Sequence, residues 1–310
     1  MNLRFEKFHG LGNDFIIIDN RENILNTNSD PDEFSKIIAQ LCDRHIGIGA
    51  DGVMFVENES EKEQQDGIQA DIRYKIFNAD GYESQICGNG LRCFTRYILE
   101  KKIIQNKKIV QIRTNIGVLE CEELSLGLYK TNIGKATAEI SKIPANPFNG
   151  DAQSIINQPL KINKTLDSQN VSSSFSEETL NVTFVNVGNP HCIIYVDDVE
   201  TAEVERIGKT LQSRKDIFPQ SVNVEFIQIL DENTLKMRVY ERGCGETMAC
   251  GTGACASVFS GILNKKNSSS SKVLLRGGEL QINVNLEDYS LQIIGPATKV
   301  FEGSMQFPLI

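Results

Sequence analysis

Two glycine-flanked cysteines carry the strongest chemical signal in the sequence. The segments "ESQICGNG" (83–90) and "ETMACGTG" (246–253) share the pattern Glu-x-x-x-Cys-Gly-[Asn/Thr]-Gly, which places Cys87 opposite Cys250 without a gap. Helical sequence follows each cysteine, so each is predicted to lie at a helix N-terminus. Unpaired backbone N–H groups and the helix dipole lower the pKa of a thiol there, and we expect more thiolate near neutral pH.

The neighbouring glycines predict an anion site beside each thiol. Backbone N–H groups at a helix N-terminus can hold a carboxylate, and glycine lets it approach closely. One thiolate could then remove a proton from a substrate carbon while the other thiol delivers a proton to the opposite face. This pattern favours two-base racemisation or epimerisation at one site shared by Cys87 and Cys250. The alternative, two ordinary buried cysteines at glycine-rich turns, does not explain why they align.

The surrounding sequence is also repeated, which predicts an internal duplication. Each half contains a Gly-Asn pair, an apolar strand, a helix, an aromatic-polar pair, the cysteine and a second helix. The interval from Asn78 to Cys87 is nine residues, and so is the interval from Glu241 to Cys250. The fold class predicted is therefore α/β, with two pseudo-symmetric domains that each contain many strands and a few helices.

Local patterns support these elements. Asp30 is predicted to cap a helix that begins at Pro31 and buries Phe34, Ile37 or Ile38, and Leu41. In the matching helix, from about Thr201, the buried face is Val204, Ile207 and Leu211. After Cys250 the sequence is apolar nearly all round, as in a buried helix. β-Branched and aromatic runs predict strands at 71–77, 110–114, 182–187, 223–230, 235–240, 280–286 and 291–295. The polar stretches 57–67, 163–178 and 264–272 are predicted to be exposed loops.

Composition excludes several classes of function. The 310 residues carry a formal charge of -9 without a basic cluster, so no nucleic-acid partner is expected. The N-terminus has no apolar core of signal-peptide length, and no later run is long enough to span a membrane. We therefore expect a cytoplasmic protein whose eight cysteines are mostly reduced and buried. No metal-ligand pattern is present among the cysteines and the three histidines, so no metal is expected.

One motif misleads. "GIGADG" (47–52) matches the glycine pattern of dinucleotide-binding sites, but it follows a predicted helix and leads into a strand, the reverse of the required order. A serine hydrolase is also disfavoured, because no G-x-S-x-G sequence occurs.

The motifs taken together resemble diaminopimelate epimerase. They are "FHGLGNDFIIID", "RHIGIGADG", "FNADG", "CGNGLRC", "VNVGNPHC", "YERGCGET" and "ACGTGACA", in order from residue 8 to about 256, and the tail "GPATKVFEGSM" is also similar. The resemblance implies a cofactor-independent isomerase that interconverts LL- and meso-2,6-diaminopimelate, for lysine and peptidoglycan synthesis. It implies two domains, each a mixed sheet curled around a central helix: residues 1–132, completed by 296–310, and residues 133–295.

The resemblance also assigns roles to residues. The catalytic base and acid fall on Cys87 and Cys250, while His191 and Glu241 adjust their acidity. The implied substrate-binding residues are Asn13, Asn78, Gly88, Asn89, Asn189, Asn223, Glu241, Arg242, Gly251 and Thr252. One position departs from the pattern, because Gly52 stands where some relatives have a glutamine that contacts substrate.

Other interpretations remain open from the sequence. A proline or hydroxyproline racemase would also place a cysteine in each half. A thiol redox protein could join Cys87 and Cys250 in a regulatory disulfide, and a non-catalytic binding module would bind ligand without exchange of its α-hydrogen. The sequence does not determine which cysteine acts on which stereoisomer, the role of the loops 57–68 and 163–178, or the oligomeric state, for which a homodimer is one expectation.

Overall fold

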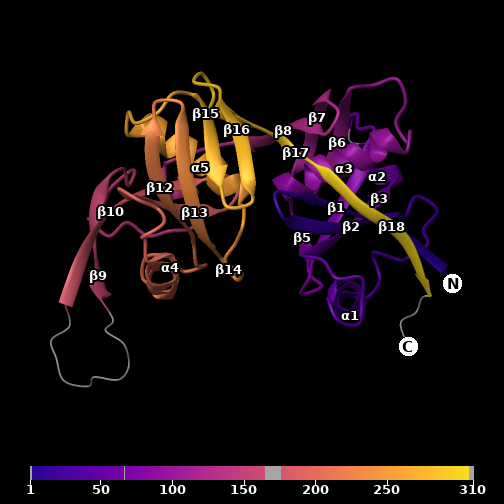
Figure 1. The fold of residues 1–310 in the computed structure, drawn as a ribbon, viewed down its shortest axis with the longest axis horizontal. Coiled ribbons are helices and arrows are strands. Elements are labelled where there is room, and N and C mark those ends of the chain that lie inside the picture. Colours follow the sequence, from indigo (N-terminus) through magenta and orange to yellow (C-terminus); the bar gives the residue numbers. More distant parts are fainter. Residues whose placement is uncertain (1, 66, 165–175, 307–310) are drawn as a thin grey trace. The chain divides into compact units, whose positions relative to one another are not determined.

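The structure is a computed structural model that describes residues 2–65, 67–164 and 176–306. The chain divides into two compact units (Figure 1): unit 1 is Met1–Asn132 with Ile293–Ile310, and unit 2 is Ile133–Gln292. The sequence-based boundaries were 132/133 and 295/296. Among the described residues, no helix is long and apolar enough to cross a membrane.

Unit 1 is a mixed sheet with helices on its faces. The strand order by pairing is β18-β1-β2-β3-β4-β6-β7-β8, with β2–β3 and β4–β6 parallel, the other pairs antiparallel, and β5 paired with β4. The strands are β1 (Asn2–Gly10), β2 (Asn13–Asp19), β3 (Gly52–Glu57), β4 (Ile72–Asn78), β5 (Glu83–Ser84), β6 (Ile109–Thr114), β7 (Gly117–Ser125), β8 (Leu128–Lys135) and β18 (Thr298–Gln306). The helices are α1 (Pro31–Cys42), α2 (Glu61–Gln64) and α3 (Gly88–Glu100).

Unit 2 repeats this plan. Its strand order is β9-β10-β11-β12-β13-β15-β16, with β11–β12 and β13–β15 parallel, the other pairs antiparallel, and β14 paired with β13. The strands are β9 (Gln158–Lys164), β10 (Ser176–Asn186), β11 (Pro190–Tyr195), β12 (Asn223–Asp231), β13 (Thr234–Glu241), β14 (Gly245–Glu246), β15 (Ser270–Leu275) and β16 (Gly278–Val284). Strand β17 (Ser290–Pro296) begins in unit 2 and ends in unit 1. The helices are α4 (Val204–Ser213), α5 (Gly251–Leu263) and the 3-10 helix η1 (Ile140–Lys142).

The two units correspond element by element, which confirms the predicted duplicated α/β fold. In each unit an antiparallel hairpin precedes a helix, a parallel strand, an antiparallel strand, a two-residue strand and a second long helix. The register agrees as well. Phe15 pairs with Gly52 where His191 pairs with Asn223, and Phe77 pairs with Glu83 where Tyr240 pairs with Glu246.

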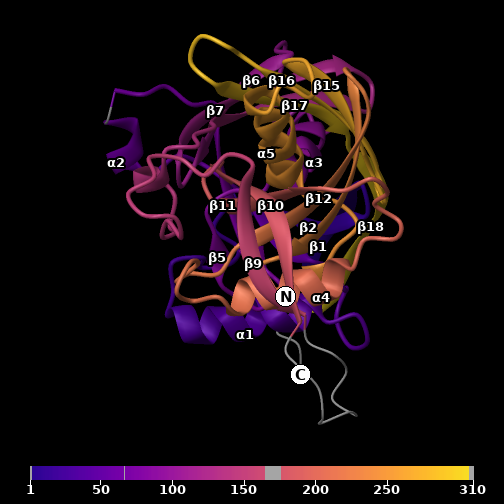
Figure 2. The same ribbon diagram turned by 90° about the vertical axis from the view of Figure 1, so that its left-hand side faces the viewer.

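The central strand of each unit is buried on both faces, so alternate side chains contact different helices. In β3, Val53 and Phe55 belong to the core against α1, whereas Met54 and Val56 belong to the core against α3. In unit 2, α4 packs on β12, β13 and β14, while α5 packs on β10, β11, β12, β15 and β16. Figure 2 shows α5 lying against the strands of unit 2, and α4 near the ends of β9 and β10.

Most local predictions are confirmed. Asp30 caps α1 by accepting hydrogen bonds from Asp32 and Glu33 N–H, and Pro31 is its first residue. The buried faces of α1 and α4 contain the predicted residues, and α5 is buried on nearly every side.

Three predictions were wrong. The stretch 57–67 is not only a loop, because it contains α2, which Ser60 and Glu63 start with a reciprocal capping box. Residues 163–164 end β9 and residues 176–178 begin β10, and the predicted loop otherwise lies at 165–175, outside the described residues. The third polar stretch runs into β15, which starts at Ser270.

Candidate functional site

Cys87 lies at the N-cap of α3 in an extended conformation, which turns its side chain back over the first helical turn. Its Sγ accepts a hydrogen bond from Gly90 N–H at 3.4 Å, and its thiol donates to Asn13 Oδ1 at 3.6 Å. The half-buried sulfur therefore caps the helix in the way that a serine hydroxyl would. This confirms that the glycine-flanked cysteine starts a helix.

Cys250 occupies the equivalent position in unit 2. It is the N-cap of α5, its Sγ accepts from Gly253 N–H at 3.3 Å, and Thr252 Oγ1 lies 3.4 Å from the sulfur. This cysteine is buried, with 6% of its surface exposed. The same backbone conformation and the same hydrogen bond thus recur at both predicted thiols.

The prediction of a lowered thiol pKa is wrong for Cys250. Burial raises the pKa of this thiol well above its usual value, the carboxylates of Glu241 and Glu225 raise it further, and hydrogen bonds from Thr252 and Gly253 only partly offset these effects. The helix N-terminus acts in the predicted direction but is the smaller effect. Cys250 is therefore held as the protonated thiol, which is the form that donates a proton.

Glycine three residues after each of the two cysteines leaves room for side chains of the sheet, because the helix there lies close to it. A Cβ at Gly90 would lie 2.8 Å from the hydroxyl of Tyr74 and 3.1 Å from Sδ of Met54. A Cβ at Gly253 would lie 2.8 Å from Oε1 of Glu225. The second glycine of each Cys-Gly-x-Gly motif thus lets α3 and α5 pack against their sheets.

Asn13 is held beside Cys87 by the segment that resembles a dinucleotide motif. Asp51, the last residue before β3, accepts from Asn13 Nδ2 at 2.9 Å and pairs with Arg44 at 2.9 Å. The amide oxygen of Asn13 therefore faces Cys87 and Asn89, whose Nδ2 lies 3.4 Å away. The "GIGADG" segment follows α1 and leads into β3, as expected, and its aspartate orients a predicted site residue.

Asn89 is buried and orders the start of α3. Arg92, on the next turn, donates to Asn89 Oδ1 at 2.6 Å, to the Gly88 carbonyl at 3.1 Å and to the Pro296 carbonyl at 3.2 Å. Arg92 has no exposed surface, which is rare for an arginine. It ties the helix end that carries Cys87 to the returning C-terminal segment of unit 1.

In unit 2, Asn223 joins two elements of the backbone. Its Nδ2 donates to the Pro190 carbonyl at 3.2 Å, and its Oδ1 accepts from Arg242 N–H at 2.9 Å. The Arg242 side chain is exposed and donates to the Gln220 carbonyl at 3.2 Å. Asn223 therefore positions the turn after β13, which carries Glu241 and Arg242.

Glu241 lies near Cys250. Burial raises the pKa of its carboxyl, and hydrogen bonds from Thr247 and Cys250 counteract part of that rise. Thr247 Oγ1 donates directly to Glu241 Oε1. The predicted pair of Glu241 and Cys250 is thus brought together within unit 2.

His191 is fully buried between two partners. Its Nδ1 lies 2.7 Å from Glu225 Oε1, and its Nε2 lies 2.8 Å from Asn189 Oδ1. Glu225 also has no exposed surface and was not among the predicted site residues. Its one available signal in the sequence is a charged residue inside the apolar strand "NVEFIQIL".

Asn78 pairs with Gly52, where β4 ends and β3 begins. Asn78 ends β4 and is exposed, and its backbone closes the turn to Tyr82. At Gly52, a Cβ would lie 2.6 Å from the Phe77 carbonyl oxygen, so a glutamine at this position would require the backbone to shift. Gly251 is the first residue of α5, beside Cys250.

Most of the other cysteines are packing residues, as predicted. Burial raises the pKa of Cys42, Cys93 and Cys121 to about 12 and that of Cys192 well above its usual value. These thiols therefore stay protonated and behave as small apolar side chains.

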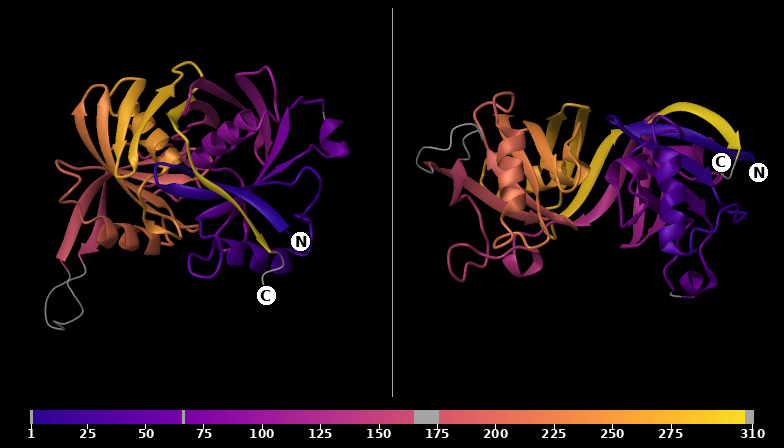
Figure 3. Two further views of the ribbon diagram at one scale, coloured as in Figure 1. Left: turned by 45° about the vertical axis from the view of Figure 1, so that its right-hand side comes forward. Right: turned by 90° about the horizontal axis from the view of Figure 1, so that it is seen from below.

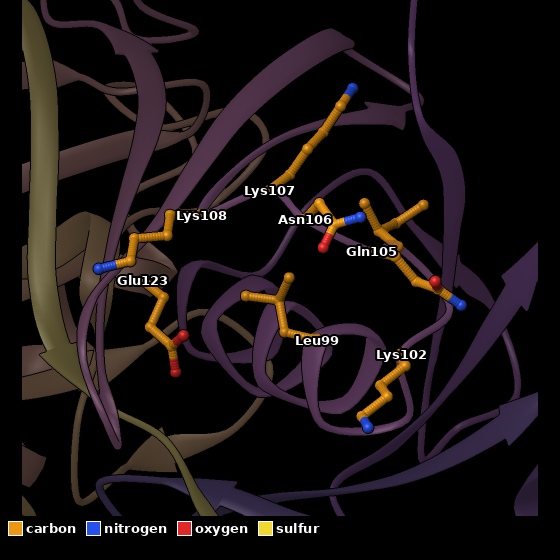
Figure 4. Close-up of a pocket in the computed structure, with 8 residues that line it drawn as sticks. Leu99, Lys102, Gln105, Asn106, Lys107, Lys108 and Glu123 are labelled. Carbon is orange, nitrogen blue, oxygen red and sulfur yellow. The ribbon is translucent and has the colours of Figure 1, made fainter.

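A pocket of about 550 Å³ on unit 1 is separate from these residues (Figure 4). Its lining includes Leu99 and Lys102, at the C-terminal end of α3, whereas Cys87 caps the N-terminal end. Lys107, Lys108 and Glu123 also line it. The pocket therefore contains none of the predicted site residues.

Comparison with known proteins agrees with the motif pattern. A family profile described as "Diaminopimelate epimerase" matches residues 5–138 and 183–300. The chain is 40% identical to the diaminopimelate epimerase of Nostoc punctiforme, across 98% of this chain and 100% of the relative. It is 39% identical to that of Halothermothrix orenii, across 98% of each.

Solved structures show the same fold at low sequence identity. A phenazine biosynthesis protein of the PhzF family from Bacillus anthracis is 17% identical with a TM-score of 0.67, covering 99% of this chain and 100% of that chain. A hydroxyproline epimerase from Agrobacterium vitis is 12% identical with a TM-score of 0.66, covering 98% and 91%. At these identities the likeness concerns the fold alone.

Proposed function

The chain belongs to the diaminopimelate epimerase family, and from this premise we propose that it interconverts LL- and meso-2,6-diaminopimelate by two-base proton transfer, without a cofactor. The observation that carries the proposal is the pair of equivalent cysteines, each bonded at a helix N-terminus by the second glycine of its motif. A duplication that served packing alone would not need a thiol at the same N-cap in both units.

The proposed reaction inverts one α-carbon. A thiolate on one face accepts the α-proton, and the electron pair of the broken C–H bond stays on carbon. The thiol on the opposite face then donates its proton to that carbon, which leaves the first sulfur protonated and the second as thiolate. Because burial holds Cys250 protonated, we assign Cys250 as the donor. Cys87 is then the acceptor, once its thiol has lost the proton that it donates to Asn13 Oδ1.

The residues around each thiol suit the groups on the reacting end of the substrate. The N–H groups of Gly88, Asn89, Gly251 and Thr252 lie in the first turns of α3 and α5, where they can bind a carboxylate and stabilise the charge that develops next to it. Asn13 Oδ1 and the Glu241 carboxylate can accept hydrogen bonds from ammonium groups. The exposed Arg242 guanidinium can pair with a carboxylate in a two-pronged arrangement.

The test is incubation with LL-diaminopimelate in D2O under reducing conditions, with deuterium at each α-carbon followed by NMR and mass spectrometry. We expect conversion to the meso isomer with one solvent deuterium at the inverted carbon. Cys87→Ala and Cys250→Ala should both abolish conversion, because each removes one of the two proton-transfer groups. Cys42→Ala and Cys255→Ala, which remove buried thiols outside the proposal, are the controls and should retain it.

The rival functions give different results in the same assay. Racemisation of proline in place of diaminopimelate would identify a proline-type racemase. Activity that appears only under oxidising conditions would indicate a thiol redox protein. Substrate binding without deuterium incorporation would indicate a binding module, and any of these results would contradict the proposed epimerase.

A further inference from the structure

A buried acid-histidine couple distinguishes the surroundings of Cys250 from those of Cys87. His191 and Glu225 both have no exposed surface and approach to 2.7 Å, and the second ring nitrogen of His191 lies 2.8 Å from Asn189 Oδ1. Glu225 is on the face of β12 toward α5, where its Oε1 would lie 2.8 Å from a Cβ at Gly253. The three side chains therefore form a continuous polar chain that starts beneath the helix end and finishes at Asn189.

The equivalent place in unit 1 carries no charged group, although the hydroxyl of Tyr74 also lies there. The strand registers make Phe15 the counterpart of His191 and Met54 the counterpart of Glu225. The glycine contacts agree, because Gly90 faces Met54 as Gly253 faces Glu225. Both Phe15 and Met54 are buried in the core against α3. The fold thus packs this position without charges, so its architecture alone does not explain the couple.

Stability does not explain the couple either. Desolvation of two ionisable groups usually cancels most of their attraction, and replacement by apolar residues of similar size is often neutral or stabilising. The second carboxyl oxygen of Glu225, Oε2, is buried and accepts no hydrogen bond from any described side chain or backbone group. Such a group normally destabilises the fold, so stability gives no reason for a carboxyl group at this position.

The hydrogen bonds define where the protons are. Asn189 Oδ1 can only accept, so His191 Nε2 carries a hydrogen. A contact of 2.7 Å between Nδ1 and a carboxyl oxygen also contains a hydrogen. Either His191 is an imidazolium beside a Glu225 carboxylate, or His191 is a neutral imidazole beside a Glu225 carboxylic acid. In both states the Nε2–H of His191 is directed at Asn189. With its oxygen engaged by that N–H, Asn189 has its NH2 group left as a donor.

We propose that Glu225 is a positioning residue that holds His191 in this orientation. Asn189 then presents its amide NH2 group to a carboxylate of the substrate. Its oxygen, which could otherwise accept from an ammonium group, is bonded to His191. The substrate part of this statement rests on the proposed function. Without Glu225, the His191 ring could carry its hydrogen on Nδ1, and Asn189 could turn its amide to donate to Nε2. The group offered to the substrate would change from a donor to an acceptor.

The first test needs no substrate. The chain has three histidines, so 15N-histidine labelling gives a spectrum simple enough to assign, with His191→Phe identifying the His191 signals. We expect a hydrogen on Nε2 of His191 in the wild type that exchanges slowly with solvent. In Glu225→Met, the residue found at this place in unit 1, the Nε2 hydrogen should exchange faster or move to Nδ1. An unchanged His191 spectrum would overturn the proposal.

The second test is kinetic. Loss of one buried hydrogen-bond partner corresponds to a fall of about tenfold or more in kcat/KM, and we expect Glu225→Met to produce it mainly through a higher KM. Glu225→Gln, which keeps a hydrogen-bonding side chain, should retain more activity. In an Asn189→Ala background, Glu225→Met should have less than about a twofold further effect, because both changes break the same chain of contacts.

Controls separate the alternatives. Glu57→Gln alters another buried carboxyl, which accepts from Asn20 at 3.0 Å and Thr27 at 2.6 Å in unit 1, and should leave KM unchanged. A fall in kcat alone, or effects of Glu225→Met and Asn189→Ala that multiply, would show that Glu225 acts on the Cys250 thiol and would contradict the proposal. Absence of turnover in the wild type would instead contradict the proposed function, and the histidine spectra would still test Glu225.

Discussion

Two opposing effects act on the sulfur of Cys250. A helix N-terminus stabilises a nearby negative charge by up to about 2 kcal/mol in partly buried sites. Full burial can shift the pKa of an ionisable group by about three to five units, or roughly 4–7 kcal/mol. Two carboxylates, from Glu241 and Glu225, add to the effect of burial. Because the effect of burial is larger, the pKa of Cys250 is raised and the thiol keeps its proton.

This direction predicts how Cys250 reacts with an alkylating reagent. Since only the thiolate reacts and its pKa is raised, alkylation by iodoacetamide should keep increasing through about pH 9 without reaching a plateau. Glu241→Gln removes one of the two carboxylates, so the pKa should fall and alkylation at about pH 8 should become faster. Peptide mass spectrometry measures the rate, with the exposed Cys244 as the internal reference. A wild-type plateau below about pH 8 would contradict the raised pKa.

At the scale of elements, ion pairs hold the segment between α1 and β3 against β1 and β2. Asp14, at the start of β2, pairs with Lys7 of β1 at 2.8 Å and with Arg44 at 2.7 Å, and Arg44 also pairs with Asp51. Burial alone would raise the pKa of Asp14, but hydrogen bonds from Arg44 and Lys7 outweigh it and lower the pKa to about 2. The same contacts keep Asp51 beside Asn13.

A lowered pKa makes part of the stability dependent on pH. The contribution of Asp14 is fully present above its unfolded pKa of 3.8 and is lost as the pH falls toward about 2. Asp14→Asn should therefore lower the free energy of unfolding by up to about 2 kcal/mol at about pH 7 and by progressively less between about pH 4 and pH 2.

Urea unfolding across this pH range measures the difference. Asp288→Asn is the matched control, because the pKa of Asp288 is also held at about 2, by Lys135, but on the exposed surface, where ion pairs contribute little. A stability loss in Asp14→Asn that is the same at about pH 7 and pH 3 would show that the charge is not its cause.

At the scale of the whole molecule, the chain ends meet in unit 1. The C-terminal strand β18 runs antiparallel to β1, with Asn2 opposite Gln306 and Phe5 opposite Gly303 (Figure 3). Unit 1 is therefore completed only after unit 2 has been traversed. A Cβ at Gly303 would lie 2.8 Å from the Phe5 ring, so this pairing depends on glycine at one point.

Gly303→Val should loosen this pairing. The added side chain displaces the buried Phe5 ring, and we expect faster hydrogen exchange in the amides of β1 and no change in β10–β13 of unit 2. Hydrogen-exchange mass spectrometry of the full chain measures both regions. Ser304→Val, at the next position on the exposed face of β18, is the control and should leave β1 unchanged. An equal increase in hydrogen exchange in both units would mean that β18 does not stabilise unit 1 alone.

The sequence by itself determined the duplication, the helix starts at Pro31, Cys87 and Cys250, most strands, and the family. These features depend on near neighbours along the chain: a cap bonds an N–H two or three residues away, and strand patterns repeat every two residues. Only the tertiary structure revealed that Arg92 is buried, that Asp51 holds Asn13, that burial keeps Cys250 protonated, and that Glu225 lies beneath Gly253. Each of these features joins residues that are distant in sequence or depends on exposure to solvent. Alternation along a strand predicts the face on which a side chain lies, but not the residues that it contacts there.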